Sequence, residues 1–130
     1  MAGDLDALLG LELHAVSAEE VTATVAVRDQ VRQPWGIVHG GLYAAVAESL
    51  ASRGTFHGVA DAGLVPLGIS NATSFLRPIA AGSVHARALR RHGGRTTWVW
   101  DVELSDDQGR LCALARVTVA VRPRPGDSGW

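Results

Sequence analysis

The chain has 130 residues, of which 47% are hydrophobic and 19% charged, and its formal net charge is −1. These values are typical of a single folded domain with its own core, and they exclude a generic nucleic-acid binder, which needs a clustered basic surface. No apolar run approaches the length of a membrane-spanning helix, and the first residues lack the basic start of a signal peptide. We therefore predict a cytoplasmic protein with neither a nucleic-acid nor a membrane partner.

The first third of the chain predicts a short helix and a hairpin. Residues 4–9 (DLDALL) favour a short amphipathic helix, with an aspartate near its N-terminus. Residues 11–17 follow as a strand, and residues 21–27 alternate apolar with smaller or hydroxylated side chains, which is typical of a half-buried strand. Residues 28–38, with Pro34 and Gly36, read as a loop.

A helix is predicted from Gly40 to about His57, followed by a loop over residues 58–63. It is apolar nearly all round, which indicates a helix buried on most sides. Glu48 lies inside it, among alanines, with no charged neighbour at helical spacing. Because burying an unpaired carboxylate is costly, Glu48 must face a polar cavity, find a partner elsewhere in the fold, or take part in chemistry.

The remainder of the chain predicts four strands, at residues 64–75, 82–89, 98–104 and 111–122, with tight turns at 92–95 and 105–109. An antiparallel six-stranded sheet wrapped around one long central helix satisfies all these patterns, so the fold class is α+β. We predict a single domain over residues 1–122 and a flexible C-terminal tail over 123–130. One helix leaves sheet edges and apolar surface open, which favours a homodimer or a larger oligomer.

Neither a disulfide nor a metal site is predicted. Cys112 is the single cysteine, and its apolar surroundings indicate a buried structural thiol. The four histidines outside the central motif (His14, His57, His85 and His92) show no ligand spacing, so we expect no metal and no cofactor.

Several short motifs carry a resemblance to a known family. They are Gln33-Pro34-Trp35-Gly36, His39-Gly40-Gly41, Ala47-Glu48-Ser49, Leu76-Arg77-Pro78 and the turn of residues 106–110. In this combination and spacing the chain resembles the hotdog-fold acyl-CoA thioesterases that carry a glutamate on the central helix. That branch includes a 4-hydroxybenzoyl-CoA thioesterase, the phenylacetate-degradation thioesterases and the proofreading thioesterase of enterobactin synthesis.

The resemblance implies roles for five residues in the hydrolysis of an acyl-CoA thioester. Glu48 corresponds to the catalytic carboxylate, as nucleophile or general base, and the Gly40 N–H to the donor that polarises the thioester carbonyl. Gln33 and His39 correspond to the residues that hold the carbonyl and the loop. Ser52 falls where the family places a hydroxyl near the attacking water or the leaving group.

Further residues are candidates for binding substrate. Gly41 lets a substrate carbonyl come close to the helix, while Trp35 and the strand that contains Asn71 shape the acyl pocket. Arginine suits the phosphates of coenzyme A, and three candidates lie at strand ends: Arg77, Arg90 and Arg91. A solvated arginine face is the alternative for each of the three.

Helix geometry adds a constraint that does not depend on the family. Eight residues separate Gly40 from Glu48, which is roughly 12 Å of helix rise. One thioester carbon cannot touch both groups in a single chain, so a site that uses both must lie between two subunits. We therefore predict that a homodimer is required for activity, and that a homotetramer forms from such dimers.

Other interpretations stay open. The chain could be a hotdog hydratase or dehydratase acting on enoyl thioesters, or a non-catalytic acyl-CoA-binding module. Glu48 could be a polar contact across a dimer, His39 could cap the helix rather than transfer a proton, and Ser52 could bond back to its own helix.

Overall fold

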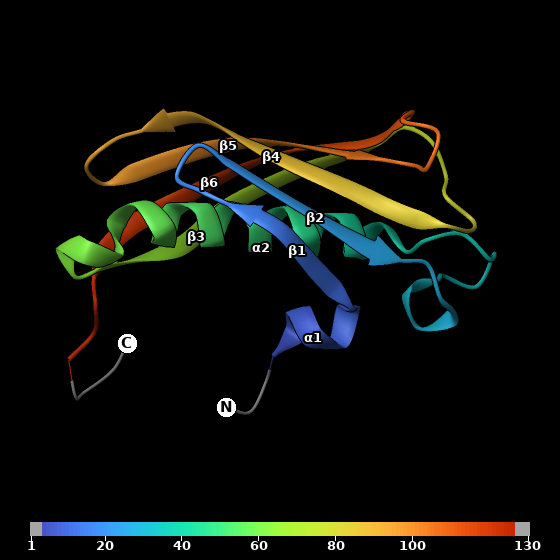
Figure 1. Cartoon of the computed structure of the whole chain (residues 1–130), viewed down its shortest axis with the longest axis horizontal. Coiled ribbons are helices and arrows are strands. Elements are labelled where there is room, and N and C mark those ends of the chain that lie inside the picture. Colours follow the sequence, from blue (N-terminus) through green and yellow to red (C-terminus); the bar gives the residue numbers. More distant parts are fainter. Residues whose placement is uncertain (1–3, 127–130) are drawn as a thin grey trace.

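The computed structural model describes residues 4–126, and in this part of the chain one long helix packs against a six-stranded antiparallel sheet in the order β1-β2-β4-β5-β6-β3 (Figure 1). The helices are α1 (Leu5–Leu9) and α2 (Gly40–Val59), with single 3₁₀ turns η1 (Asp29–Val31) and η2 (Ala60–Ala62). The strands are β1 (Leu11–Val16), β2 (Glu20–Ala26), β3 (Leu64–Phe75), β4 (Ser83–Gly93), β5 (Thr97–Ser105) and β6 (Leu111–Pro123). The predicted elements and the predicted architecture are confirmed.

The core lies between α2 and the inner face of the sheet. Leu50 of α2 and Trp100 of β5 are fully buried, and the Trp100 indole N–H donates to the Thr55 hydroxyl at 3.0 Å. A Cβ at Gly54 would collide with the Trp100 ring, and one at Gly58 with the Trp98 ring. The two glycines therefore let the helix approach the indoles, and both tryptophans belong to the core.

Three predicted boundaries were wrong in extent. The helix continues to Val59 and η2 follows, where a loop from residue 58 was expected, because Gly58 is held beneath Trp98. β4 runs to Gly93 rather than ending near residue 89, because its last residues pair with the start of β5 and displace the turn. Pro123 belongs to β6 and pairs with Leu64, one residue beyond the predicted end of the last strand; residues 127–130 of the predicted tail lie outside the described residues.

The sheet has two edges, β1 and β3, and β3 is the longer one. β3 pairs with β6 and leaves its other side open, with Ile69 and Phe75 about 60% exposed. α1 lies on the same side of the sheet as α2 (Figure 1). None of the helices in residues 4–126 is long and apolar enough to cross a membrane.

Candidate active site

The site begins where loop 32–39 enters α2. His39 is the N-cap residue, and its Nδ1 accepts the Gly41 N–H at 2.8 Å. The cap satisfies one of the amides that a helix N-terminus leaves free. It also fixes the ring, so Nδ1 is occupied, and the Gly41 N–H is not available to a substrate in this arrangement.

Gly40 is the first residue of α2, and its N–H has no hydrogen-bond acceptor within residues 4–126. A Cβ at this position would lie 3.0 Å from the Phe75 ring, so the absence of a side chain lets β3 close on the helix start. A free amide at a helix N-terminus, where the positive end of the helix dipole lies, is suited to hold a developing oxyanion.

A hollow of about 430 Å³ opens beside this amide, and we call it the Gly40 pocket. Its lining residues are Gln33, Val38, Gly40, Tyr43, Phe75, Leu76, Arg77 and Pro78. The Gln33 side-chain oxygen accepts the Trp35 N–H, which leaves its NH₂ group to donate. Arg77 is exposed at the rim and makes no ion pair in the part of the chain that the structure describes.

Trp35 lies at the tip of the same loop and is 88% exposed. It lines neither of the pockets that hold the other site residues. The role of Trp35 in shaping the acyl pocket therefore stays a prediction.

Glu48 lines a second hollow, of about 660 Å³, which we call the Glu48 pocket. Its walls are Leu5, Asp6, Ala44, Ala45, Glu48, Ser49, Ser52, Arg53 and Asn71. The carboxylate lies against Gly68 of β3, where a Cβ would come within 3.3 Å of Oε2. Glu48 is exposed, so the prediction that α2 is buried on most sides was wrong for this face, whose open stripe passes through Ala44, Glu48 and Ser52.

A charged cluster beside Glu48 was missed by sequence reasoning. The Asp6 carboxylate accepts the Ser49 hydroxyl at 2.5 Å and is bound by Arg53, with Nη2 at 2.8 Å and Nε at 3.2 Å. Arg53 therefore lies in the same pocket as Glu48 but is engaged by Asp6. The partners are 43 and 47 residues apart, so no local spacing could reveal them.

Asn71 and Ser52 both line the Glu48 pocket. The Asn71 amide donates to the Ala44 carbonyl at 2.9 Å, and its oxygen accepts the Thr73 hydroxyl at 2.7 Å. The bond to Ala44 ties β3 to α2 one turn before Glu48, and the bond from Thr73 lies within β3. Asn71 therefore positions the helix as well as lining the pocket.

Arg90 and Arg91 lie on β4 and line neither pocket. The Arg90 guanidinium lies 4.8 Å from the Trp98 ring centroid and 3.8 Å from a Glu19 oxygen. Arg91 lies 3.4 Å from Asp101. The structure does not bring these two arginines together with the other predicted site residues.

The two pockets share no lining residue and draw on different parts of one continuous helix. Since α2 is unbroken from Gly40 to Glu48, roughly 12 Å of rise separates the Gly40 amide from the Glu48 carboxylate. One pocket contains a carboxylate, and the other contains a backbone amide without an acceptor in residues 4–126.

Residues 36–113 match the thioesterase superfamily. This range contains α2, with Gly40 and Glu48, and all of β3, β4 and β5. The chain belongs to the thioesterase superfamily. A Pseudomonas aeruginosa thioesterase is 38% identical over 122 residues, 94% of this chain and 84% of that one. A variant of it superposes with a TM-score of 0.88 at 36% identity, covering 93% of this chain and 87% of that one.

Two further similarities agree with this membership. A thioesterase structure from Haemophilus influenzae has a TM-score of 0.88 and 30% identity, and covers 94% of this chain and 85% of that one. The proofreading thioesterase EntH of Cronobacter turicensis is 33% identical over 119 residues, 92% of this chain and 86% of that one. The predicted hotdog fold is confirmed.

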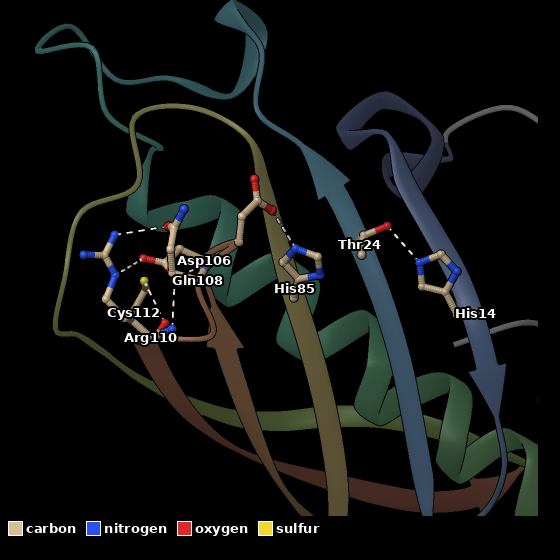
Figure 2. Close-up of polar contacts among 8 residues, drawn as sticks. His14, Thr24, His85, Asp106, Gln108, Arg110 and Cys112 are labelled. Carbon is tan, nitrogen blue, oxygen red and sulfur yellow. Dashed lines mark hydrogen bonds and ion pairs between the residues drawn. The ribbon is translucent and has the colours of Figure 1, made fainter.

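Asp106 and Cys112 line neither pocket and belong to a group of polar contacts around Arg110 (Figure 2). The Asp106 carboxylate accepts the Arg110 Nε–H at 2.7 Å and the backbone N–H groups of Gln108 and Arg110 at 3.0 and 2.9 Å. Burial raises the pKa of Asp106, but these hydrogen bonds outweigh it and hold the pKa below the ordinary 3.8. Burial raises the pKa of the Cys112 thiol, as expected of a structural cysteine.

Tyr43 is the one lining residue of the Gly40 pocket with a buried hydroxyl. Burial raises its pKa from 10.0 to about 12, so the phenol stays neutral. The Ile79 backbone lies near enough to lower the pKa slightly, but the geometry of a hydrogen bond to the Tyr43 oxygen is not met within residues 4–126. Its ring lies 6.1 Å from that of Phe75, and both aromatics line the Gly40 pocket.

Proposed function

We propose that the protein hydrolyses acyl-CoA thioesters to the free acid and coenzyme A, in an active site made by two copies of the chain. Glu48 of one copy acts on a thioester whose carbonyl oxygen is held by the Gly40 N–H of the other. The separation of carboxylate and amide into two pockets, roughly 12 Å apart on one helix, carries this proposal. A two-fold arrangement would give each of two sites one complete set of groups.

Two routes of hydrolysis suit Glu48. As a general base it takes a proton from water while the water oxygen bonds to the thioester carbon; the C–S bond then breaks, and the thiolate recovers the proton. As a nucleophile it forms a mixed anhydride with release of the thiol, and water then cleaves the anhydride. Its exposed carboxylate, with Arg53 engaged by Asp6, is free for either role.

Supporting groups surround the two main ones. Gln33 can donate to the carbonyl region from the Gly40 pocket, and Ser52 lies one turn beyond Glu48. Arg77, exposed at the rim of the Gly40 pocket, suits a coenzyme A phosphate. The similarity to EntH supports the predicted branch with glutamate on the central helix. The homotetramer and the cytoplasmic location stay predictions.

The test measures release of free thiol from a panel of aryl and medium-chain acyl-CoAs. We expect turnover by the wild-type protein and a loss of about 10³-fold in kcat for Glu48→Gln, which keeps the shape but cannot accept a proton or attack. Glu103→Gln, an exposed glutamate on β5, is the matched control and should retain full activity. No thiol release from any substrate, or equal rates in the two variants, would contradict the proposal.

The same panel separates the alternatives. A hydratase would change the absorbance of crotonyl-CoA without releasing thiol; this role would need a free histidine base, whereas the His39 Nδ1 is taken by Gly41. A non-catalytic module would bind acyl-CoA tightly without turnover.

A further inference from the structure

The short helix α1 forms one wall of the Glu48 pocket. Leu5 and Asp6 both line the hollow, opposite Ala44 and Ala45 of α2. Leu5 is 55% exposed, although it is a large apolar residue one helical turn before Leu9, which packs against the core. Leu5 therefore gives the Glu48 pocket an apolar wall that belongs neither to the sheet nor to α2.

This wall is fastened at several points. Asp6 binds both Ser49 and Arg53 of α2, and its side chain is only 19% exposed. At the other end of α1, Arg28 donates to the Leu8 carbonyl at 2.5 Å. Gly10, with φ of 76°, ends the helix in a left-handed conformation and turns the chain into β1. The position of Leu5 relative to Glu48 is therefore fixed by the fold.

The pocket wall suits an apolar ligand group. The polar groups of Asp6, Ser49 and Arg53 are engaged with one another, so the apolar surfaces left around Glu48 are the methyl groups of Ala44 and Ala45 and the side chain of Leu5. Ser52 adds one hydroxyl to this lining. The pantetheine arm of coenzyme A carries amides that need hydrogen-bond partners, whereas an acyl chain needs none. Arg77, suited to phosphate, lies in the other pocket.

We propose that Leu5 is a specificity-determining residue that limits the size of the acyl group, with Asp6 as the positioning residue that holds the wall in place. This inference rests on the proposed function for the claim that an acyl-CoA occupies the pocket. Enlarging residue 5 should shorten the space for the acyl group without touching the carboxylate or the amide.

The test uses S-alkyl-CoA thioethers, which lack the carbonyl and so measure binding without chemistry. S-methyl-CoA and S-decyl-CoA are titrated calorimetrically into the wild type, Leu5→Trp and Leu8→Trp. Leu8 is the matched control, because it lies on the same helix, is 72% exposed and does not line the pocket. We expect Leu5→Trp to weaken binding of S-decyl-CoA about tenfold and to leave S-methyl-CoA unchanged, with no effect of Leu8→Trp.

The outcomes distinguish the inference from the function on which it rests. Equal effects of Leu5→Trp and Leu8→Trp, or equal effects of Leu5→Trp on both thioethers, would overturn the role of Leu5. Binding that depends on chain length and on Leu5, in a protein that releases no thiol from any acyl-CoA, would uphold Leu5 and contradict hydrolysis. No binding of either thioether to the wild type would contradict both.

Asp6→Asn tests the positioning role separately. It removes the charge that binds Arg53 but keeps an acceptor for the Ser49 hydroxyl. We expect the ratio of S-decyl-CoA to S-methyl-CoA affinity to change while Asp4→Asn, which alters only the cap of α1, leaves it unchanged. An unchanged affinity ratio in both variants would show that Asp6 does not position the pocket wall.

Discussion

The Glu48 pocket and the Gly40 pocket lie along the same helix and have opposite chemistry. The first contains an exposed carboxylate, with the polar groups around it bound to one another. The second contains a backbone amide without an acceptor in the described residues and an exposed arginine at its rim. Under the proposed function, each pocket supplies a group that the other lacks. Because roughly 12 Å of helix rise separates the two groups, one helix would then contribute to two sites, each completed by a second copy of the chain.

The role of the Gly40 N–H can be tested with two variants that add the same Cβ to the Gly40 pocket. Gly40→Pro and Gly40→Ala both place a Cβ against Phe75, but only proline removes the N–H. Proline is tolerated at the first position of a helix, so folding should survive. We expect kcat for thiol release to fall about 10²-fold more in Gly40→Pro than in Gly40→Ala. Equal rates in the two variants would show that the amide plays no part.

The Glu48 pocket depends on a hydrogen bond that holds β3 to α2. Asn71→Ala removes the donor to the Ala44 carbonyl and should lower the free energy of unfolding by about 1 kcal/mol. Because the helix then shifts relative to β3, we also expect kcat to fall about tenfold. Thr73→Val, which removes the hydrogen bond to the Asn71 oxygen but leaves the bond between Asn71 and Ala44 intact, is the control for kcat. A full kcat in Asn71→Ala would limit Asn71 to a role in stability.

Acid should destabilise the structure beside the Gly40 pocket first, because it protonates Asp106. The N–H groups of Leu76 and Arg77 donate to the Cys112 carbonyl, so the rim of the Gly40 pocket is attached to the strand that follows the Asp106 turn. The pKa of Asp106 is lower in the folded protein than the ordinary 3.8, so its stabilisation is present above pH 3.8 and is lost as the pH falls toward the folded value.

Thermal unfolding at several pH values checks this effect, the smallest of the set. We expect the Tm of Asp106→Asn to lie a few degrees below that of the wild type at neutral pH, and the gap to narrow below pH 3.8. Asp61→Asn, in the η2 turn, is the control. A constant gap across this range would exclude Asp106 as the titrating group.

Sequence periodicity predicted the helices and strands but not which strands pair with one another. The alternation in residues 111–121 and the alanine-rich run after Gly40 predicted β6 and α2 because both follow from local burial patterns. The pairing of β3 with β6 joins segments about 50 residues apart, and local patterns carry no signal for it. The extension of β4 to Gly93 has the same cause, since the partner strand decides where the ladder ends.

The candidate site shows the same division. Gly40, Glu48 and their separation could be predicted because all lie on one helix, whose geometry is known in advance. The contact of Glu48 with Gly68 and the engagement of Arg53 by Asp6 could not, because each joins distant segments. The exposure of Glu48 also differs from expectation, since a run of alanines looks alike whether it faces a core or an open pocket.

The shared site is tested most directly by mixing two inactive proteins. Glu48→Gln and Gly40→Pro are unfolded together, refolded at equal concentration and assayed for thiol release. In a random mixture half of the dimers contain one chain of each kind, and each such dimer has one intact site and one that lacks both groups. We predict recovery of about a quarter of wild-type activity, from statistical mixing in a two-fold dimer. Activity no higher than that of the separate variants would contradict the account.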